Sequence, residues 1–483
     1  MKLWDYQQQA VDFIKKKKRV YLALDLGMGK TITSLAAMDS VAKKNIMLVA
    51  EKNEIVNSQN FKKEVENYFF VNDVKNYGLS YLNLRNDELP DVQENCRYVC
   101  GINPDGLVKH DVNDINESTD VMIVDEATTA KTTTTARFKR VHKIAKEMEY
   151  LVLLSGTPMM NGAAELYAPL LLLEHPMIAD KGAKGRKAFE AVFAGGHYRK
   201  IRNTGKWFQD YVWWAKGANN VRVLRYLIKD NFFFMRKTDT KVFKKKTRTI
   251  RTVPMTLPWL AEYQNAWNEY LITARKRNVN MDNVMELQQL IENGQIYQVN
   301  SRWKADSVVS DIASGRYGDK RIVIFSMFIE TDLLIREYLR RMDISYRTFD
   351  EVREWKEGNE QVLVGRIQAH GKGTNLPEAS VALFVDMSFV PAQNIQAECR
   401  IDRPEQKNDM LVVYYITEGK DVIDEHVRRI NQDKARKIDE FMRPLTAQEI
   451  AEMPDMIEAL KQKFPKECAI LGIGYPQLPL MKV

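Results

Sequence analysis

Residues 23–31 (ALDLGMGKT) restrict the fold of this chain more than any other segment does. They follow an apolar run and precede a helical pattern, which is the context of a phosphate-binding loop. In such a loop Gly27 and Gly29 let backbone N–H groups approach phosphates at a helix N-terminus. Lys30 then reaches the β- and γ-phosphates, and Thr31 binds Mg²⁺. The strict pattern has glycine where this chain has Leu24, so a glycine-rich turn before a helix is the alternative.

Apolar, β-branched runs alternate with helical patterns twice along the chain. Strands that alternate with helices predict parallel sheets covered on both faces. Two such sets predict an α/β fold with two parallel-sheet lobes and helical insertions. The strand candidates are 20–26, 46–50, 98–102, 121–125 and 150–155 in the first set, and 321–326, 361–367, 381–387 and 411–417 in the second.

The expected domain boundaries follow from this alternation. We expect the first lobe over residues 1–235, with an insert over about 163–232, and the second lobe over 301–440. A helical linker or protrusion is expected over 236–300, and a helical tail over 441–483.

Charge and composition are those of a globular chain with a polyanion partner or a well-solvated surface. The chain has 483 residues and a net charge of +8, with 45% hydrophobic residues. The basic excess is local, at 15–19 (KKKKR) and 241–251 (KVFKKKTRTIR). Such runs fit phosphate binding, and the alternative is an ordinary solvated surface.

The cysteines and the N-terminus carry no signature of export. The four cysteines form no CxxC pair and no zinc spacing, so we expect reduced thiols. The N-terminus is no signal peptide, and the most apolar run, 166–173 (LYAPLLLL), is too short to span a bilayer. We expect a cytoplasmic protein of a bacterium or a phage-infected host, or a nuclear protein if the source is a eukaryote.

A second motif, 121–131 (VMIVDEATTAK), ends an apolar strand in two adjacent carboxylates. Ligands bind at the carboxyl edge of a parallel sheet. There Asp125 can hold Mg²⁺ through its water shell, and Glu126 can orient and deprotonate an attacking water. A strand-ending acidic turn is the alternative, and the phosphate loop upstream makes it less favoured.

A third motif, 396–406 (QAECRIDRPEQ), lies in the other lobe. Arg400 and Arg403 are three residues apart, so we expect them to share a helix face. Arginine stabilises charge on a transferring phosphoryl group. Hydrolysis would then be fastest when the lobes close, which converts ATP turnover into lobe motion. The alternative is a charged surface helix.

The order of these motifs resembles the superfamily 2 helicases, and within them the Swi/Snf-type DNA-dependent ATPases. The resemblance implies two RecA-like lobes, ATP and Mg²⁺ as cofactors, and DNA as partner. It also implies that Gln7 recognises adenine and that Gly373 and Gln396 contact the nucleotide. Besides the three motifs above, the matching segments are 3–14 (LWDYQQQAVDFI), 153–167 (LLSGTPMMNGAAELY), 232–238 (FFFMRKT), 322–328 (IVIFSMF) and 371–379 (GKGTNLPEA).

The chain departs from this family's pattern at several positions. Leu24 and Asp25 stand where many relatives have Asp and Glu, and DEAT replaces the commoner DEAH. The segment 404–406 (PEQ) replaces a usual Gly-Gln ending. The residues expected to carry the phosphate chemistry are all present: Lys30, Asp125, Glu126, Arg400 and Arg403.

In this family the two lobes grip one strand of DNA through its phosphates. The resemblance implies DNA contacts around Lys52, Ser326, Thr374 and Asn375. The SGTP segment would link the γ-phosphate to the DNA grip, and lobe motion would advance the chain about one nucleotide per ATP.

Residues 195–214 form a basic, aromatic block inside the first-lobe insert. Segments 197–201 and 206–214 flank RNTG, which favours a tight reversal, so we expect a β-hairpin with a basic tip. Aromatic rings can stack on unpaired bases, and Arg or Lys can follow phosphates. The alternative is a small aromatic core, which we favour for any single ring such as Trp213. The candidate DNA contacts in this block are Arg199, Lys200, Arg202, Lys206 and Trp207.

The residues around this block resemble the annealing-helicase branch of the Swi/Snf-type enzymes, which act at stalled forks and branched DNA. The small size fits a compact bacterial or bacteriophage enzyme. We therefore expect a monomeric ATP-dependent DNA helicase or translocase that unwinds, reverses or branch-migrates forked DNA. The alternatives are a duplex translocase that displaces bound proteins and a nucleotide-gated DNA-binding scaffold without enzymatic activity.

Overall fold

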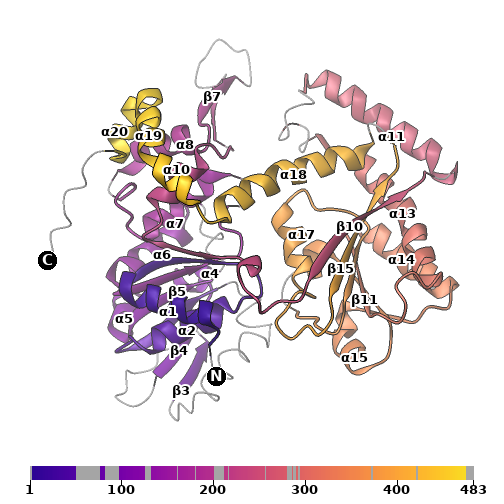
Figure 1. Cartoon of the computed structure of the whole chain (residues 1–483), viewed down its shortest axis with the longest axis horizontal. Coiled ribbons are helices and arrows are strands. Elements are labelled where there is room, and N and C mark those ends of the chain that lie inside the picture. The colour runs from indigo at the N-terminus through magenta and orange to yellow at the C-terminus, as the bar shows by residue number, and fades with distance from the viewer. Residues whose placement is uncertain are drawn as a thin grey trace. The chain divides into compact units, whose positions relative to one another are not determined.

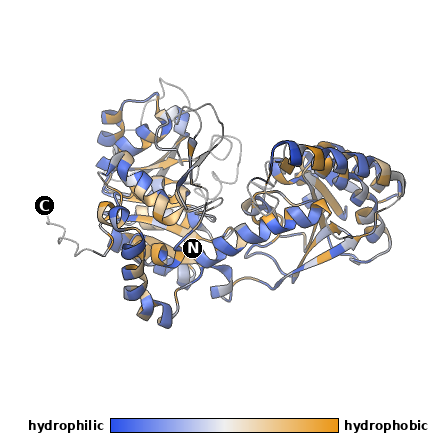
Figure 2. Cartoon of the chain, turned by 90° about the horizontal axis from the view of Figure 1, so that it is seen from above, coloured by the Kyte–Doolittle hydropathy of each residue, from blue (hydrophilic) through white to orange (hydrophobic). Residues whose placement is uncertain are grey.

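The computed structural model divides the chain into two compact units, residues 1–239 with 437–483, and residues 240–436. Each unit is built on its own parallel sheet, and Figure 2 shows the apolar residues gathered in these sheets. The structure describes residues 3–50, 77–81, 97–125, 132–159, 162–179, 181–200, 211–215, 217–255, 257–279, 286, 290–291, 294–370, 374–419 and 422–474.

The first unit contains a seven-stranded sheet in the order β3-β4-β2-β5-β6-β1-β9. All of its described pairs are parallel. The central strands are buried along almost their whole length, as expected for apolar runs covered on both faces. The strands are β1 (Arg19–Leu24), β2 (Asn45–Val49), β3 (Tyr77–Tyr81), β4 (Arg97–Ile102), β5 (Thr119–Val124), β6 (Tyr150–Leu154) and β9 (Phe232–Met235).

The helices of the first unit come from both ends of the chain. Near the C-terminus, α19 contacts α10 and α20 contacts α8, and their apolar residues join the core of this unit. The helices are α1 (Asp5–Lys17), α2 (Lys30–Asp39), α4 (Pro104–Leu107), α5 (Val112–Ser118), α6 (Ala136–Glu147), η3 (Ala163–Leu166), α7 (Tyr167–Leu172), α8 (Gly182–Phe193), α10 (Val221–Leu227), η4 (Lys237–Asp239), α19 (Ala447–Lys463) and α20 (Pro465–Leu471).

An antiparallel hairpin extends from the first unit beside α8 and α10 (Figure 1). Its strands are β7 (His197–Lys200) and β8 (Tyr211–Trp214), paired from His197 opposite Trp214 to Lys200 opposite Tyr211. The hairpin predicted for the basic, aromatic block is therefore confirmed in its two strands. Residues 201–210 between the two strands, among them Arg202, Lys206 and Trp207, lie outside the described residues.

The second unit contains a six-stranded parallel sheet in the order β10-β15-β14-β11-β13-β12. Apolar clusters cover both faces of this sheet. The strands are β10 (Lys246–Val253), β11 (Ile322–Ser326), β12 (Tyr346–Thr348), β13 (Val362–Arg366), β14 (Val381–Phe384) and β15 (Met410–Thr417). The helices are α11 (Leu257–Lys276), α13 (Ile296–Ala313), α14 (Ile329–Arg341), η5 (Phe349–Glu351), α15 (Val352–Glu357), α16 (Ile367–His370) and α17 (Pro391–Glu398), with α18 (Ile423–Met442) passing from this unit into the first.

The predicted α/β class with two parallel-sheet lobes is confirmed. Each of the nine strand candidates corresponds to a strand, and the strands β3, β9, β10 and β12 were not among the candidates. Within the part of the chain that the structure describes, no helix is both long and apolar enough to cross a membrane.

Candidate functional site

Three loops of the first unit meet at the carboxyl edge of its sheet. In the strand order, β6 lies between β5 and β1. The residues that follow these strands therefore lie side by side: Asp125 after β5, Ser155 after β6, and the loop 25–29 after β1. This edge is where parallel α/β sheets bind ligands.

The loop after β1 has the backbone geometry of a phosphate-binding turn. Gly27 and Gly29 have φ angles of +84° and +74°, in the left-handed region that favours glycine. Gly29 is the N-cap of α2, so Lys30 and Thr31 begin the helix. A Cβ on Gly29 would lie 2.6 Å from Gln7 Nε2. Because Gly29 has no side chain, the N–H groups of the first turn of α2 face this edge of the sheet without obstruction from it.

Helix α1 braces this loop from the other side. The Tyr6 hydroxyl donates to the carbonyl of Met28 at 2.9 Å, and Gln7 Nε2 donates to the same carbonyl at 3.2 Å. Gln7 Oε1 accepts from the Trp4 backbone N–H at 2.9 Å. Burial raises the pKa of Tyr6 to about 12, so its hydroxyl stays a donor at neutral pH. Gln7, predicted to recognise adenine, thus also holds the phosphate-binding loop.

Lys30 lies against the segment that follows β6. Its ammonium donates to the Leu24 carbonyl at 3.3 Å. A Cβ on Gly156 would lie 3.1 Å from Lys30 Nζ and 2.6 Å from Leu26 Cγ, so only glycine allows this approach. Ser155 Oγ accepts from the Thr157 N–H at 3.1 Å. The SGTP segment and the glycine-rich loop therefore form one packed surface.

The expected magnesium ligands lie at this same edge. Asp125 directly follows β5, and its N–H donates to the Val49 carbonyl at 2.8 Å. Thr31 is the second residue of α2 and is partly exposed. A hydroxyl and a carboxylate are the hard oxygen donors that Mg²⁺ takes alongside phosphate and water. Glu126 lies outside the described residues.

Asp25, singled out as a departure from the family pattern, links the loop to the end of the first unit. Its Oδ2 accepts from the Lys237 N–H at 2.9 Å, and its own N–H donates to the Met235 carbonyl at 3.1 Å. Lys237 begins η4, just before the boundary between the two units. A carboxylate on the first N–H of a helical turn is a favourable cap. The sequence contained no signal for this contact between distant segments.

In the second unit, the prediction that Arg400 and Arg403 share a helix face is wrong. Helix α17 ends at Glu398, and both arginines lie in the turn beyond it. The turn tightens through bonds from the Arg400 N–H to Ala397 and from the Ile401 N–H to Glu398. Pro404 disfavours helical conformation at Arg403, since a proline restricts the residue before it, so a helix face shared by both arginines is disfavoured.

The turn that carries the arginines is bonded to the segment predicted to contact DNA. The Leu376 N–H donates to the Arg400 carbonyl at 2.7 Å, and the Arg400 guanidinium donates to the Thr374 carbonyl at 3.5 Å. The Asn375 carbonyl accepts from the Lys356 ammonium. The Arg403 Nε atom is buried without a hydrogen-bond partner among the described residues. Gln396 is buried on α17, and Gly373 lies outside the described residues.

A buried ion cluster that sequence reasoning missed holds this turn against β10. The Glu398 carboxylate accepts from Arg248 Nε at 2.8 Å and from the Tyr414 hydroxyl at 2.8 Å. Lys246 contacts Glu398 at 3.1 Å and Asp402 at 2.8 Å. Burial by itself raises the pKa of Glu398, but Lys246 and Arg248 hold it below the usual range. Glu398 and Asp402 lie on either side of Arg400, so the cluster fixes the arginine-bearing turn.

Ser326, a predicted DNA contact, is fully buried, and its hydroxyl donates to the Phe328 carbonyl at 3.4 Å. The next residue, Met327, donates its N–H to Asp386 Oδ2 at 3.1 Å. Asp386 follows β14 and accepts from the Ser301 hydroxyl at 2.6 Å. Burial raises the pKa of Asp386, opposed by the nearby Lys304. The path of the chain after β11 is thus set by a buried carboxylate.

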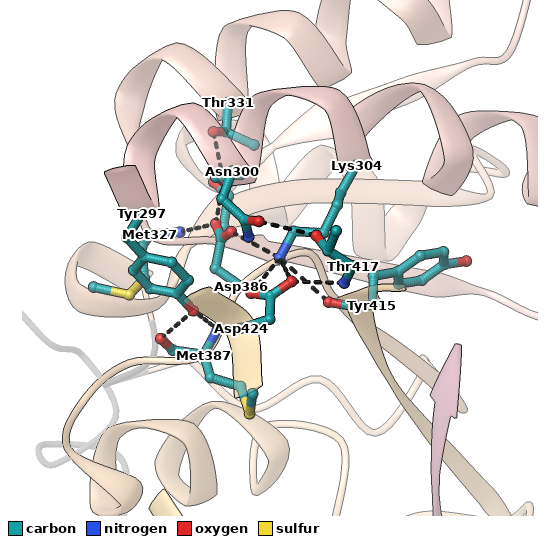
Figure 3. Close-up of polar contacts among 12 residues, drawn as sticks. Tyr297, Asn300, Lys304, Met327, Thr331, Asp386, Met387, Tyr415, Thr417 and Asp424 are labelled. Carbon is teal, nitrogen blue, oxygen red and sulfur yellow. Dashed lines mark hydrogen bonds and ion pairs between the residues drawn. The ribbon is translucent and has the colours of Figure 1, made fainter. Parts of the chain in front are cut away.

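Lys304 is the centre of this second buried cluster (Figure 3). Its fully buried ammonium donates to both oxygens of Asp424 at 3.0 and 3.1 Å, and lies 3.6 Å from Asp386 Oδ1. Asp424 also accepts from the Thr417 N–H at 2.7 Å. The cluster joins α13, the ends of β14 and β15, and the start of α18. Lys304 sits in the middle of a long helix, where the sequence offered no sign of burial.

The structure brings some predicted site residues together and leaves others untested. Gln7, Gly27, Gly29, Lys30, Thr31 and Asp125 gather in the first unit, and Gln396, Arg400, Arg403, Thr374 and Asn375 gather in the second. Arg199 and Lys200 lie on β7, but their side chains are outside the described residues. Lys52, Glu126, Arg202, Lys206, Trp207 and Gly373 lie outside the described residues altogether.

Comparison with known proteins adds sequence similarities to this geometry. Residues 1–160 match the family model "Type III restriction enzyme, res subunit". A "SWI/SNF-related matrix-associated actin-dependent regulator of chromatin subfamily A-like protein 1 homolog" of Caenorhabditis elegans is 24% identical over 86% of this chain and 58% of its own length. The human "DNA annealing helicase and endonuclease ZRANB3" is 23% identical over 86% of this chain and 38% of its own length.

The chain therefore spans about half the length of the curated relatives it matches. Among solved structures, the "Sulfolobus solfataricus SWI2/SNF2 ATPase core in complex with dsDNA" aligns over 92% of this chain and 98% of its own. The sequence identity is 15% and the TM-score is 0.39.

Proposed function

The chain is a relative of the Swi/Snf-type ATPases of helicase superfamily 2, and we propose that it couples ATP hydrolysis to movement on DNA and remodels branched DNA. The observation that carries the proposal is the packed edge of the first unit, where Lys30, Gly156 and Asp125 follow three neighbouring strands. This arrangement fits the phosphates of a nucleotide at the N-terminus of α2.

Each residue at this edge has a chemical role in the proposed reaction. The N–H groups at the start of α2 and the Lys30 ammonium bind the phosphate oxygens. Thr31 and Asp125 hold Mg²⁺, which when bound neutralises charge on the phosphates. Glu126 orients the attacking water and accepts its proton.

We propose that two arginines of the second unit act in the same reaction. Arg400 and Arg403 would stabilise the charge that develops on the transferred phosphoryl group. Arg400 donates to the Thr374 carbonyl and accepts from the Leu376 N–H, and these bonds support coupling because they join a predicted DNA-contacting segment to a predicted catalytic arginine. DNA bound at Thr374 and Asn375 would thereby position Arg400.

The β7–β8 hairpin supports branched DNA as the substrate. It extends from the first unit, and the sequence between its two strands contains Arg202, Lys206 and Trp207. An aromatic ring that stacks on an unpaired base, with cations along the phosphates, recognises a point where strands separate. We propose that the hairpin contacts the junction while the two lobes move along one strand as a monomer.

The test compares ATP hydrolysis and strand displacement on single-stranded, duplex, forked and four-way DNA. We expect the highest ATPase rate and strand displacement on forks and junctions. ATPase activity on plain duplex without strand separation anywhere would replace this proposal with a translocase that displaces proteins. Replacing Glu126 with Gln should abolish turnover, and unchanged turnover would contradict the mechanism. Removing 199–206 should spare duplex-stimulated ATP hydrolysis and impair fork processing.

A further inference from the structure

The base of the β7–β8 hairpin is bonded directly to the C-terminal end of α8. The Gly196 N–H donates to the Glu190 carbonyl at 2.8 Å on the incoming side. On the outgoing side, the Gly217 N–H donates to Ala194 at 2.8 Å and the Asn219 N–H donates to Phe193 at 2.7 Å. A Cβ on Gly196 would lie 2.4 Å from the Trp213 ring, so the two strands leave α8 in close contact. The hairpin base and α8 therefore form one rigid part.

Within this part, one side chain of the hairpin is held by a buried carboxylate. Trp213 Nε1 donates to Glu190 Oε2 at 2.6 Å. The Trp213 ring also contacts Tyr198 edge-on, with centroids 5.1 Å apart, as expected for a packed rather than a base-stacking ring. Glu190 is only 5% exposed, and a buried carboxylate needs charged or hydrogen-bonding partners on both oxygens.

The second oxygen of Glu190 connects the hairpin to the segment that follows Asp125. Arg186, one turn earlier on α8, donates its Nε to Glu190 Oε1 at 2.8 Å. The same guanidinium donates from Nη1 to the Thr133 hydroxyl at 3.3 Å. Thr133 lies in the turn before α6, at the far end of the segment that begins with the predicted catalytic carboxylates.

A backbone contact connects the same base to the segment after β6. The Ala163 N–H donates to the Gly217 carbonyl at 2.9 Å. Ala163 begins η3, a few residues after Gly156, which packs against Lys30. The hairpin base therefore contacts the predicted 153–167 segment through the backbone of Ala163, and its side chains contact Thr133, two residues beyond the predicted 121–131 segment.

We infer that Glu190 is a positioning residue that couples the hairpin to the ATP site, so that a DNA branch held by the hairpin changes the rate of ATP turnover. The path runs from Trp213 through Glu190 and Arg186 to Thr133. This inference rests on the proposed function for its DNA partner. Coupling between two binding sites is reciprocal. If DNA at the hairpin changes the affinity of the nucleotide site, a bound nucleotide changes the affinity of the hairpin for DNA by the same factor.

Reciprocity allows a test that needs no DNA. Hydrogen exchange of the peptides covering 186–200 and 211–215 is measured with and without Mg²⁺ and a non-hydrolysable ATP analogue. We expect the analogue to slow exchange at the hairpin base several-fold in the unaltered protein. The effect should disappear in Thr133→Val, which removes the hydroxyl, and in Trp213→Phe, which removes the indole N–H and keeps a packed ring.

Lys187→Met is the matched control. The Lys187 ammonium donates to the Tyr198 hydroxyl at 2.8 Å and lies over both hairpin rings, but it is not on the path to Thr133. This variant should keep the analogue's effect on exchange. The double variant Thr133→Val with Trp213→Phe should lose no more of the analogue's effect on exchange than either single variant, because non-additive effects identify two positions on one path.

A parallel ATPase measurement separates failure of this inference from failure of the proposed function. The ratio of fork-stimulated to duplex-stimulated turnover should fall several-fold in Thr133→Val and Trp213→Phe, with turnover in the absence of DNA unchanged. A nucleotide-dependent exchange effect without any fork preference would overturn branched-DNA function and keep the coupling. No exchange effect at the hairpin base, or the same effect in all variants, would overturn the coupling whatever the DNA preference.

Discussion

Replacing the buried Lys304 with Met should destabilise the second unit far more than the same replacement of an exposed lysine. The ammonium is fully buried and is bonded to Asp424 at 3.0 Å, with Asp386 3.6 Å away. Methionine fits the aliphatic stem but leaves two buried carboxylates without their cation. Removing one partner of a buried ion pair costs about 3–5 kcal/mol, because an uncompensated charge remains.

This free energy converts into a measurable shift in melting temperature. The second unit spans residues 240–436. For a domain of about that size, each kcal/mol lowers Tm by roughly 2–4 °C, so the variant should lose roughly 6–20 °C. Calorimetry measures this shift, and the same substitution at the exposed Lys320 is the control, with an expected change near zero.

The pH dependence tests the electrostatic cause. Burial raises the pKa of Asp386, so the folded state holds the Asp386 proton more tightly than the unfolded state does. The contribution of Asp386 to stability is therefore present at low pH and is lost as pH rises through its folded-state pKa. Removing Lys304 raises that pKa further, so the cost should be largest at neutral pH and shrink toward pH 5. If the Lys304 substitution lowered the free energy of unfolding equally at pH 5 and at neutral pH, or if its Tm matched that of the Lys320 control, the charge argument would be refuted.

Three further substitutions test other contacts. Glu398→Gln should lower kcat for ATP hydrolysis about tenfold, which corresponds to ~1.4 kcal/mol of activation free energy, because Lys246 and Arg248 lose the charge that fixes the arginine-bearing turn. Steady-state kinetics measure kcat, and an unchanged value would contradict this role of Glu398. Asp25→Ala should lower the free energy of unfolding by about 1 kcal/mol and speed tryptic cleavage after Lys237, because the Lys237 N–H loses its acceptor. Cleavage at the same rate as in the unaltered protein would argue against this cap. Gly29→Ala should weaken ATP binding, as measured by titration, because the positive φ of residue 29 and the nearby Gln7 side chain exclude a Cβ. An unchanged affinity would show that the loop adapts to the added methyl group.

Much of the fold could be predicted from local pattern. Nine apolar runs became strands, because a strand buried on both faces has to be apolar along its length. β10 was missed for the converse reason. It alternates Thr with basic residues at the edge of the sheet, and only its pairing with β15 makes it a strand. Its basic residues, taken as a phosphate-binding or solvated run, include Lys246 and Arg248, which neutralise Glu398.

The candidate site was predictable only where its chemistry is local. Gly29 stands where a positive φ is needed, next to the lysine and threonine that start a helix. The arginine turn was mispredicted as a helix face, because spacing alone did not take Pro404 and the contacts of Arg400 into account. For Trp213 the sequence favoured packing over base stacking, and the hydrogen bond of its indole to Glu190 agrees with that prediction.

The sequence by itself determined two parallel-sheet lobes, a glycine-rich loop before a helix, a carboxylate-ended strand and a hairpin, because periodicity and turn chemistry act over a few residues. The tertiary structure alone decided which charges are neutralised and which distant segments are bonded to one another. Lys304 with Asp424, Asp25 with Lys237 and Glu190 with Trp213 are pairs distant in the sequence or hidden among ordinary charged residues. The cost of a buried charge depends on what the fold places within a few ångströms, and no local pattern records that distance.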